Sequence, residues 1–213
     1  MNTESKILIA IAAVVTVVAS VLLVVGGGSD KQGDKTVDPE RLVRADSIQT
    51  NPDAKVTLVE FGDLQCPACA AAQPVVQQVR KQFGSKVNFV WRHFPLGIHP
   101  NARPAANASE AARAEGKFFE FSDKLFATQG AWGEASSANA IQLFVQYGTG
   151  LGVSGPAIEK AVKDNQYKSR IDKDVTDGEA LGVNSTPTFF LDGKKVETTE
   201  LLAAVKDAVD RKK

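Results

Sequence analysis

The feature that most constrains this chain is the sequence Cys66-Pro67-Ala68-Cys69, which contains its only two cysteines. It follows the apolar run Val56–Phe61, which is typical of a central β-strand, and it precedes a segment with the apolar spacing of a helix. A strand, a tight turn and a helix place Cys66 at a helix N-terminus, where unpaired backbone N–H groups and the helix dipole favour negative charge. The sequence therefore predicts an exposed nucleophilic thiolate of low pKa at Cys66.

The residues that follow Cys66 are consistent with this position. Pro67 suits the first helical residue, because the N–H group that it lacks would be unpaired there. Cys69 lies one helical turn further on, and we expect it to be the more buried of the two thiols. It is placed to attack a mixed disulfide formed on Cys66, which is the exchange step of a dithiol oxidoreductase.

A Cys-x-x-Cys pair has two other common roles, which are zinc binding and a structural disulfide. Zinc needs about four ligands, and the other soft candidates, His93 and His99, are spaced outside the usual finger pattern. A disulfide that closes so short a loop would constrain the unfolded chain only slightly. We therefore favour redox chemistry, and we predict neither a metal ion nor a cofactor.

Glu60 is the one carboxylate in the otherwise apolar strand, six residues before Cys66. If it is buried beneath the dithiol, its pKa is raised and it can accept a proton from Cys69 during exchange. The alternative is a surface glutamate at the edge of the sheet.

An apolar segment near the N-terminus predicts a membrane anchor. Residues Ile7–Val25 form an uncharged run of 19 residues, which is long enough to cross a bilayer as a helix. The alternative is a cleaved signal peptide, whose apolar core is typically ~7 to 15 residues long and precedes a small-residue cleavage site. We expect an anchor over residues 1–25, followed by a flexible Gly-, Asp- and Lys-rich tether over residues 26–40.

Charge and chemistry together predict the location of the domain. The charges around the apolar segment slightly favour an N-terminus inside the cell, and disulfide formation belongs in an oxidising compartment. The 25 Lys and Arg residues balance the 25 Asp and Glu residues, so the composition provides no basic field for nucleic acid. We expect a single-pass protein of the cell membrane with its catalytic domain outside the cytoplasm and no nucleic-acid partner.

After the tether, the sequence predicts the order β-α-β, a helical block, and β-β-α. The Ala-rich helix Ala105–Ala114 of the block is expected to expose Glu110 and Arg113. Asp192-Gly193 is a strong hairpin signal. The predicted elements are the strands Val56–Phe61, Val87–Arg92, Thr188–Leu191 and Lys195–Glu197, the helical block over about residues 98–182, and the final helix Glu200–Val209.

Three segments together resemble the thioredoxin superfamily, and within it the DsbA-like thiol-disulfide oxidoreductases with a helical insertion, including membrane-anchored BdbD-type members. The resemblance covers about residues 40–211 and implies an α/β thioredoxin fold, so we assign residues 41–213 to this domain, with the insertion at about 98–182. The segments are Val59-Glu60-Phe61 before the two cysteines, Arg92-His93-Phe94-Pro95-Leu96 after the second strand, and Gly182–Phe190, which contains Thr186-Pro187.

The resemblance also implies roles for particular residues. In this family the proline that matches Pro187 follows a cis peptide bond and faces the dithiol, and the backbone at Thr186 meets a substrate strand. Substrate contacts are therefore expected at Pro67, Ala68, Thr186 and Pro187, with catalytic roles for both cysteines and for a buried acid at Glu60. Ala68 departs from the best-known DsbA motif, which has histidine there and stabilises its thiolate with it. His93 would be structural.

The resemblance implies a membrane-tethered dithiol oxidase that introduces disulfides into exported cysteine-containing proteins. A membrane redox partner would re-oxidise its dithiol. Two alternatives stay open at this point: a disulfide reductase or isomerase, and a non-enzymatic tethered peptide-binding module that uses the groove around Pro187.

Overall fold

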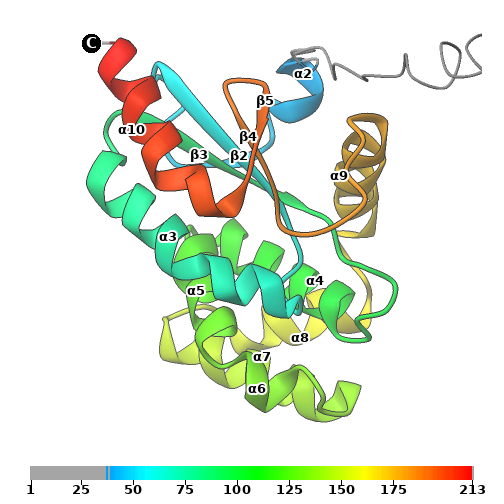
Figure 1. Ribbon diagram of the computed structural model, residues 1–213. Coiled ribbons are helices and arrows are strands. Elements are labelled where there is room, and N and C mark those ends of the chain that lie inside the picture. The colour runs from blue at the N-terminus through cyan, green and yellow to red at the C-terminus, as the bar shows by residue number, and fades with distance from the viewer. Residues whose placement is uncertain (1–36, 38, 213) are drawn as a thin grey trace, which may run out of the picture. The chain divides into compact units, whose positions relative to one another are not determined.

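The computed structural model describes residue 37 and residues 39–212 (Figure 1). A five-stranded sheet with the order β1-β3-β2-β4-β5 forms the centre of this domain. The predicted membrane anchor and most of the tether lie outside the described residues. Within the described part of the chain, no helix is long and apolar enough to cross a membrane.

The elements follow the predicted order. The strands are β1 (Ile48–Gln49), β2 (Val56–Gly62), β3 (Val87–His93), β4 (Thr188–Leu191) and β5 (Lys194–Val196). The helices are α2 (Pro39–Leu42), α3 (Pro67–Phe83), α4 (Ala102–Ala114), α5 (Phe118–Ala127), α6 (Gln129–Trp132), α7 (Ser137–Gly150), α8 (Gly155–Lys163), α9 (Lys168–Ala180) and α10 (Leu201–Arg211), with a short 3₁₀ turn, η1 (Thr198–Glu200), before α10.

The pairing of the strands confirms the predicted β-α-β and β-β-α units. β2 and β3 run parallel on either side of α3 in the sequence, whereas β4 pairs antiparallel with both β2 and β5. The turn between β4 and β5 has positive φ angles of 48° at Asp192 and 86° at Gly193, as a tight hairpin turn requires. The two-residue strand β1, which pairs with β3, was not predicted because two residues show no periodicity.

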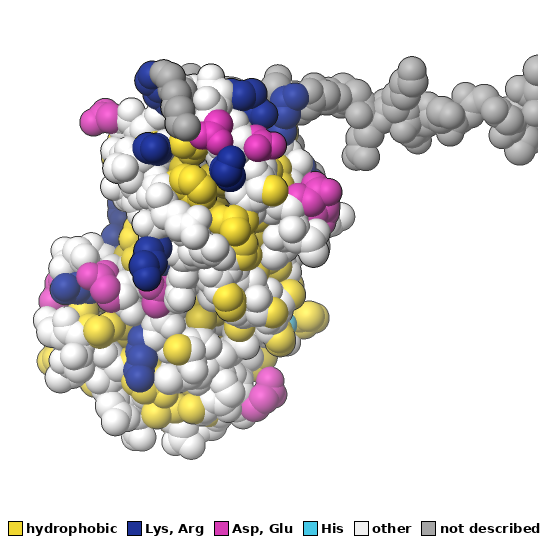
Figure 2. All heavy atoms as spheres, turned by 60° about the vertical axis from the view of Figure 1, so that its left-hand side comes forward, with side chains coloured by type: hydrophobic (Ala, Val, Ile, Leu, Met, Phe, Trp, Pro, Cys, Tyr) yellow, Lys and Arg dark blue, Asp and Glu magenta, His cyan; other side chains and the backbone are white. Residues whose placement is uncertain are grey.

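Helices cover both faces of the sheet (Figure 1). On one face, Leu58 of β2 packs in an apolar cluster with residues of α3 and α10. On the other face, Val59 and Phe61 pack with Val90 of β3 and Phe190 of β4. On the side that carries α3 and α10, Lys and Arg side chains are interspersed with Asp and Glu (Figure 2), in agreement with the balanced composition.

The insertion between β3 and β4 is helical, as predicted, and runs from α4 to α9. The expectation that Glu110 is exposed is wrong, because its residue is only 1% exposed. Helices α5, α7 and α8 all pack against the Ala-rich helix α4 and cover most of its surface. The spacing of polar residues along α4 therefore does not show which side faces solvent. Glu110 is instead paired with Arg170 of α9 at 2.6 Å.

Candidate active site

The two cysteines lie where β2 leads into α3. Cys66 is the N-cap residue of α3, with φ −67° and ψ 123°, and Pro67 lies in the first turn, as predicted. Both cysteines are free thiols. Cys66 is 6% exposed and Cys69 is 0% exposed. The expectation that Cys66 is exposed is therefore wrong in this structure, because its sulfur packs against the loop that contains Thr186.

That loop closes the other side of the dithiol. The Thr186–Pro187 peptide bond is cis, in agreement with the resemblance. The Sγ atom of Cys66 lies 3.4 Å from the carbonyl oxygen of Thr186, to which the thiol can donate. Pro67 and Ala68 are exposed beside them. The structure thus brings together all four residues at which substrate contacts were expected, next to the Cys66 sulfur or within one turn of it.

The surroundings of the two thiols shift their pKa values in opposite directions. The hydrogen bond from the Cys69 thiol is the largest cause that lowers the pKa of Cys66, to about 5, against the opposing effect of burial. The backbone N–H groups of Cys69 and Ala68 lower it further. Burial, the hydrogen bond to Cys66 and the nearby Glu60 raise the pKa of Cys69 well above its ordinary value. One thiol therefore ionises readily while its neighbour keeps its proton.

Glu60 lies in the middle of the sheet and is 0% exposed. Its neighbours in register are Trp91 of β3 and Phe189 of β4, and neither of its carboxyl oxygens has a protein hydrogen-bond partner. Burial raises the pKa of Glu60 to about 8, while Arg80 acts against this shift. The buried interpretation of Glu60 is thus confirmed over the surface one, and its role in proton transfer stays a prediction.

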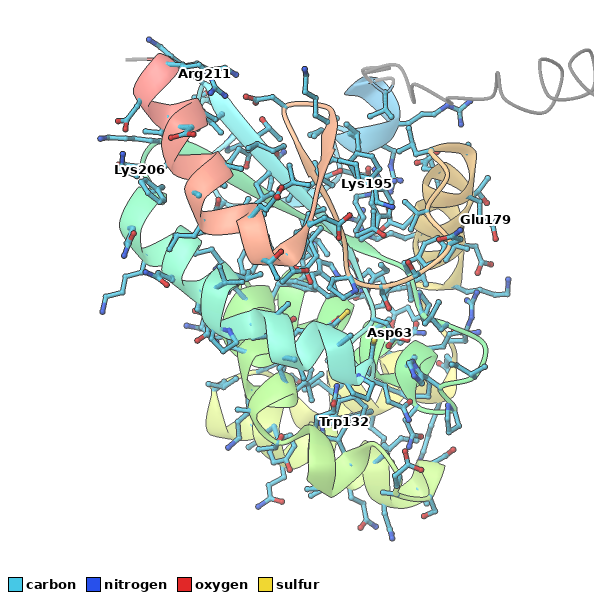
Figure 3. The ribbon with its side chains drawn as sticks, in the orientation of Figure 1. Asp63, Trp132, Glu179, Lys195, Lys206 and Arg211 are labelled. Carbon is cyan, nitrogen blue, oxygen red and sulfur yellow. The ribbon has the colours of Figure 1, made fainter. Side chains whose placement is uncertain are left out.

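Asp63 and His99, for which no catalytic role was predicted, hold the turn between β2 and α3. The Asp63 carboxylate accepts hydrogen bonds from the backbone N–H groups of Gln65 at 2.8 Å and Leu96 at 3.0 Å, and it lies 2.6 Å from Nδ1 of His99. The backbone N–H of Asp63 donates to Sγ of Cys69 at 3.5 Å. Figure 3 shows Asp63 beside the sulfur atoms. A signal was present in the sequence, since Asp63 directly follows the buried strand.

The helical insertion also fixes the loop that carries Cys66. Gln129 of α6 donates to the carbonyl oxygen of Cys66 at 3.1 Å. The side chain of Gln65 accepts from the N–H of Asn101 at 2.6 Å and donates to the carbonyl of Gly133 at 2.7 Å. The insertion therefore positions the dithiol as well as covering it.

The histidines weighed as zinc ligands are engaged elsewhere. Nδ1 of His93 accepts from the indole N–H of Trp91 at 3.2 Å, and its Nε2 lies 3.2 Å from Glu110. His99 is paired with Asp63. No group of three or more His, Cys, Asp or Glu side chains that could hold a metal ion occurs in the described part of the chain.

Comparison with known sequences identifies the family. The thioredoxin family profile, described as "Thioredoxin", matches residues 44–211. This chain belongs to the thioredoxin family. Its structure is similar to oxidised BdbD from Bacillus subtilis, with a TM-score of 0.68 and 22% identity over 77% of this chain and 93% of that chain. The DsbA-like fold predicted from the sequence is thereby confirmed.

Two further comparisons extend this result. A thioredoxin-like oxidoreductase from Silicibacter pomeroyi DSS-3 has a TM-score of 0.65 and 26% identity, covering 83% of this chain and 98% of that chain. Among curated sequences, Na(+)/H(+) antiporter NhaA 1 of Mycobacterium sp. strain KMS is 40% identical over 166 residues, which is 76% of this chain and 25% of that protein. The thioredoxin-family chain thus spans about a quarter of the length of this curated relative.

Proposed function

We propose that this thioredoxin-family protein is a thiol-disulfide oxidoreductase that acts on cysteine-containing proteins, with Cys66 as the nucleophile and Cys69 as the resolving thiol. The observation that carries this proposal is the opposite shift of the two pKa values at the N-terminus of α3. A low pKa makes Cys66 a thiolate at neutral pH and also a good leaving group. The similarity to the thioredoxin-like oxidoreductase of Silicibacter pomeroyi supports an oxidoreductase role.

The direction that the site favours is oxidation of the substrate, starting from a Cys66–Cys69 disulfide. A substrate thiolate attacks Sγ of Cys66, so that a mixed disulfide forms and Cys69 leaves as a thiolate. Glu60, protonated at neutral pH because its pKa is about 8, gives its proton to Cys69, whose own pKa is raised. A second substrate thiolate then attacks the first substrate sulfur and releases the Cys66 thiolate. Two electrons move from the substrate to the dithiol.

Stabilisation of the reduced form supports oxidation over reduction. A thiol whose ionised form is favoured makes the dithiol state more stable and the disulfide a stronger oxidant. The Thr186 carbonyl beside Cys66 and the exposed Pro67 and Ala68 offer the surface on which a substrate strand would lie. After each turnover the dithiol must be re-oxidised, and for this we propose a membrane redox partner.

We further propose that the domain is tethered outside the cytoplasm by the apolar segment Ile7–Val25. This proposal rests on the sequence alone, since the segment lies outside the described residues. Ion exchange is not proposed, because the antiporter relative shares only a quarter of its length with this chain. Carbonate extraction and protease added from outside intact cells test the tether: the expected product is membrane-bound and protease-sensitive, whereas a soluble product beginning near Gly26 would show a cleaved signal.

Replacing Cys69 by Ala tests the exchange reaction directly. Without the resolving thiol, mixed disulfides on Cys66 should accumulate in cells and should be released by dithiothreitol. The matched control is the double variant Cys66→Ser/Cys69→Ala, which should trap nothing. If Cys69→Ala traps no protein while Cys66 still reacts with small alkylating reagents, the peptide-binding module becomes the better explanation.

Alkylation measured against pH tests the assignment of the nucleophile. The rate of iodoacetamide reaction with reduced protein should follow an inflection near pH 5 from Cys66, far below the ~8.5 of a free cysteine. Mass spectrometry would assign the modified residue. An inflection at or above the free-cysteine value would remove the basis for the assignment.

A further inference from the structure

The two ends of the central sheet differ in charge. Cys66 follows the end of β2, whereas Val56 and Val87 begin β2 and β3 in register at the other end. The backbone N–H of Asp192, in the turn between β4 and β5, donates to the carbonyl oxygen of Thr57 at 2.8 Å. This turn therefore lies beside the starts of β2 and β3, away from the dithiol.

The C-terminal end of α10 lies at the same place. Lys212, directly after α10, has its Nζ atom 2.7 Å from the carboxylate of Asp192, and it donates to the carbonyl oxygen of Lys55 at 2.7 Å. Figure 3 shows Arg211 at the opposite end of the domain from Asp63. We call this region, formed by the starts of β2 and β3, the β4–β5 turn and the end of α10, the far end. The seven residues of β2 place it roughly 20 Å from the dithiol, at about 3.3 Å per residue.

The first of two clefts at the far end lies between the start of β2, the start of β3 and the end of α10. It has a volume of about 340 Å³, and its charged lining consists of Lys55, Lys86 and Lys212 with one acidic residue, Asp53. All four of these residues are exposed. The cleft thus presents a net positive charge to solvent.

The second cleft lies between β5 and α10. It has a volume of about 680 Å³, and its charged lining consists of Lys194, Lys195 and Arg211 with Asp192 and Asp207. Together the two clefts present six basic side chains and three acidic ones, although the whole chain has 25 of each sign. Figure 2 shows Lys and Arg side chains gathered at this upper end of the domain, with fewer acidic ones between them. A local excess of positive charge attracts an anionic surface.

The chain enters the domain at the far end. The backbone N–H of Val37 donates to the carbonyl oxygen of Gly193, in the β4–β5 turn, at 3.3 Å. In the sequence, only residues 26–36 separate Val37 from the apolar segment Ile7–Val25. Such a length of chain spans at most about 40 Å when it is fully extended. An anchor in that segment would therefore hold the far end, and not the dithiol, nearest to the bilayer.

We propose that the far end docks on the anionic lipid headgroups of the membrane, with the Lys and Arg side chains of its two clefts against the lipid phosphates. The inference rests on the membrane tether proposed above and does not depend on the direction of exchange. Because the chain enters the domain at this end, lipid is the anionic partner that the tether keeps within reach, and a short tether makes weak contacts effective. Docking holds the dithiol roughly 20 Å above the membrane surface, where it faces exported proteins.

The test uses the full chain in phospholipid nanodiscs, made either of phosphatidylcholine alone or of phosphatidylcholine with phosphatidylglycerol. Exposed lysines are acetylated to a low extent with an N-hydroxysuccinimide ester, and mass spectrometry gives the rate at each lysine. Lys55, Lys86 and Lys195 should react several-fold more slowly in the anionic discs. Lys160 and Lys163 of α8, which are exposed on the helical insertion, are internal controls and should react at the same rate in both. The protection should disappear at about 1 M salt, where the Debye length falls to ~3 Å.

A pair of charge variants tests the clefts themselves. Each Lys near an anionic membrane surface strengthens binding about fivefold, so Lys86→Gln/Lys195→Gln should weaken docking about 25-fold. In anionic discs Lys55 should then react as fast as it does in neutral discs. The matched control, Lys160→Gln/Lys163→Gln, removes two exposed charges from the insertion and should leave Lys55 protected. Circular dichroism checks that each variant is folded.

The outcomes separate docking from the anchor on which it rests. Equal rates at the far-end lysines in neutral and anionic discs, or protection that survives Lys86→Gln/Lys195→Gln, would overturn docking even though the chain stays in the disc. Equal protection by inorganic phosphate or duplex DNA added to neutral discs would overturn the assignment to lipid. A chain that elutes apart from both kinds of disc would overturn the anchor, and docking with it.

Discussion

Each face of the central sheet buries an ionisable side chain of the neighbouring strands β2 and β3, but only one of these two side chains has protein hydrogen-bond partners. On one face Arg92 of β3 is 0% exposed, yet its guanidinium donates to Asp174 and Asp177 of α9, both at 2.7 Å. It also donates to the Leu42 carbonyl at 2.8 Å. On the other face Glu60 of β2 is equally buried but has no protein partner for either oxygen. The two positions are adjacent, since Arg92 pairs in register with the residue after Glu60.

This difference separates a group that stabilises the fold from one that is available for chemistry. Although burial opposes it, hydrogen bonds from Arg44 and Arg92 lower the pKa of Asp177, so this carboxylate stays ionised and paired with both guanidinium groups. Burial without a partner raises the pKa of Glu60 to about 8, which keeps a proton available near neutral pH. A buried acid with a pKa near the working pH is what proton transfer requires.

Removing the buried ion pairs of Arg92 should have the largest effect on stability. We call the face of the sheet that carries these pairs the paired face. Arg92→Met leaves Asp174 and Asp177 buried with one guanidinium fewer, and removal of one partner from a buried ion pair typically costs about 3–5 kcal/mol. Urea unfolding would measure the loss. Arg103→Met is the matched control, because Arg103 pairs with Asp172 at the exposed surface and should cost less than ~1 kcal/mol. Equal losses in the two variants would contradict the contrast drawn between the faces.

The paired face also shows where sequence reasoning ends. Arg92 and Asp174 are 82 positions apart, and no local pattern connects a residue near the end of a strand to a helix so distant in the chain. The same holds for Asp63 and His99, which meet only after the loop following β3 folds back onto the turn before α3. Periodicity reports which side of an element is apolar, and it carries no information on such pairings.

Helix starts and tight turns, which depend on residues adjacent in the sequence, could be predicted. Cys66 at the start of α3 follows from a strand, a turn and Pro67, and the β4–β5 hairpin follows from Asp192-Gly193. Burial was harder to predict, because it depends on packing between distant elements. Cys66 is covered by the Thr186 loop, and Glu110 is enclosed by helices of the insertion.

The contributions of Glu60 and Asp177 to the free energy of unfolding should change in opposite directions with pH. Its pKa is about 8 when folded and ordinarily about 4.5, so above pH 4.5 the unfolded chain loses a proton that the folded protein keeps. This group's contribution to stability is therefore complete below pH 4.5 and declines as pH rises towards 8. Asp177, with its lowered pKa, acts in reverse and loses its contribution only in acid.

Urea unfolding of wild type and Glu60→Gln would isolate this contribution. Between pH 4.5 and 7 wild type should lose about 3 kcal/mol relative to Glu60→Gln, at ~1.36 kcal/mol per unit of pKa difference. The Cys66–Cys69 disulfide form should be used, because then neither thiol titrates. A pH-independent difference would mean that Glu60 is ionised when folded, and it could not then donate a proton to Cys69 at neutral pH.

The smallest effect concerns Ala68, whose backbone N–H is one of the groups that lower the pKa of Cys66. Ala68→His adds a polar side chain on the exposed surface beside the thiolate, without touching Glu60 or the paired face. One added polar contact of ~1 to 2 kcal/mol corresponds to a few tens of mV in a two-electron couple, where about 30 mV is ~1.4 kcal/mol. Because the contact stabilises the reduced form, the potential should become more oxidising. Equilibration with glutathione would measure both proteins. A wild-type potential as low as the about −270 mV of thioredoxin would favour the reductase over the oxidase, since the lowered pKa of Cys66 would then not have stabilised the reduced form enough to make the disulfide an oxidant.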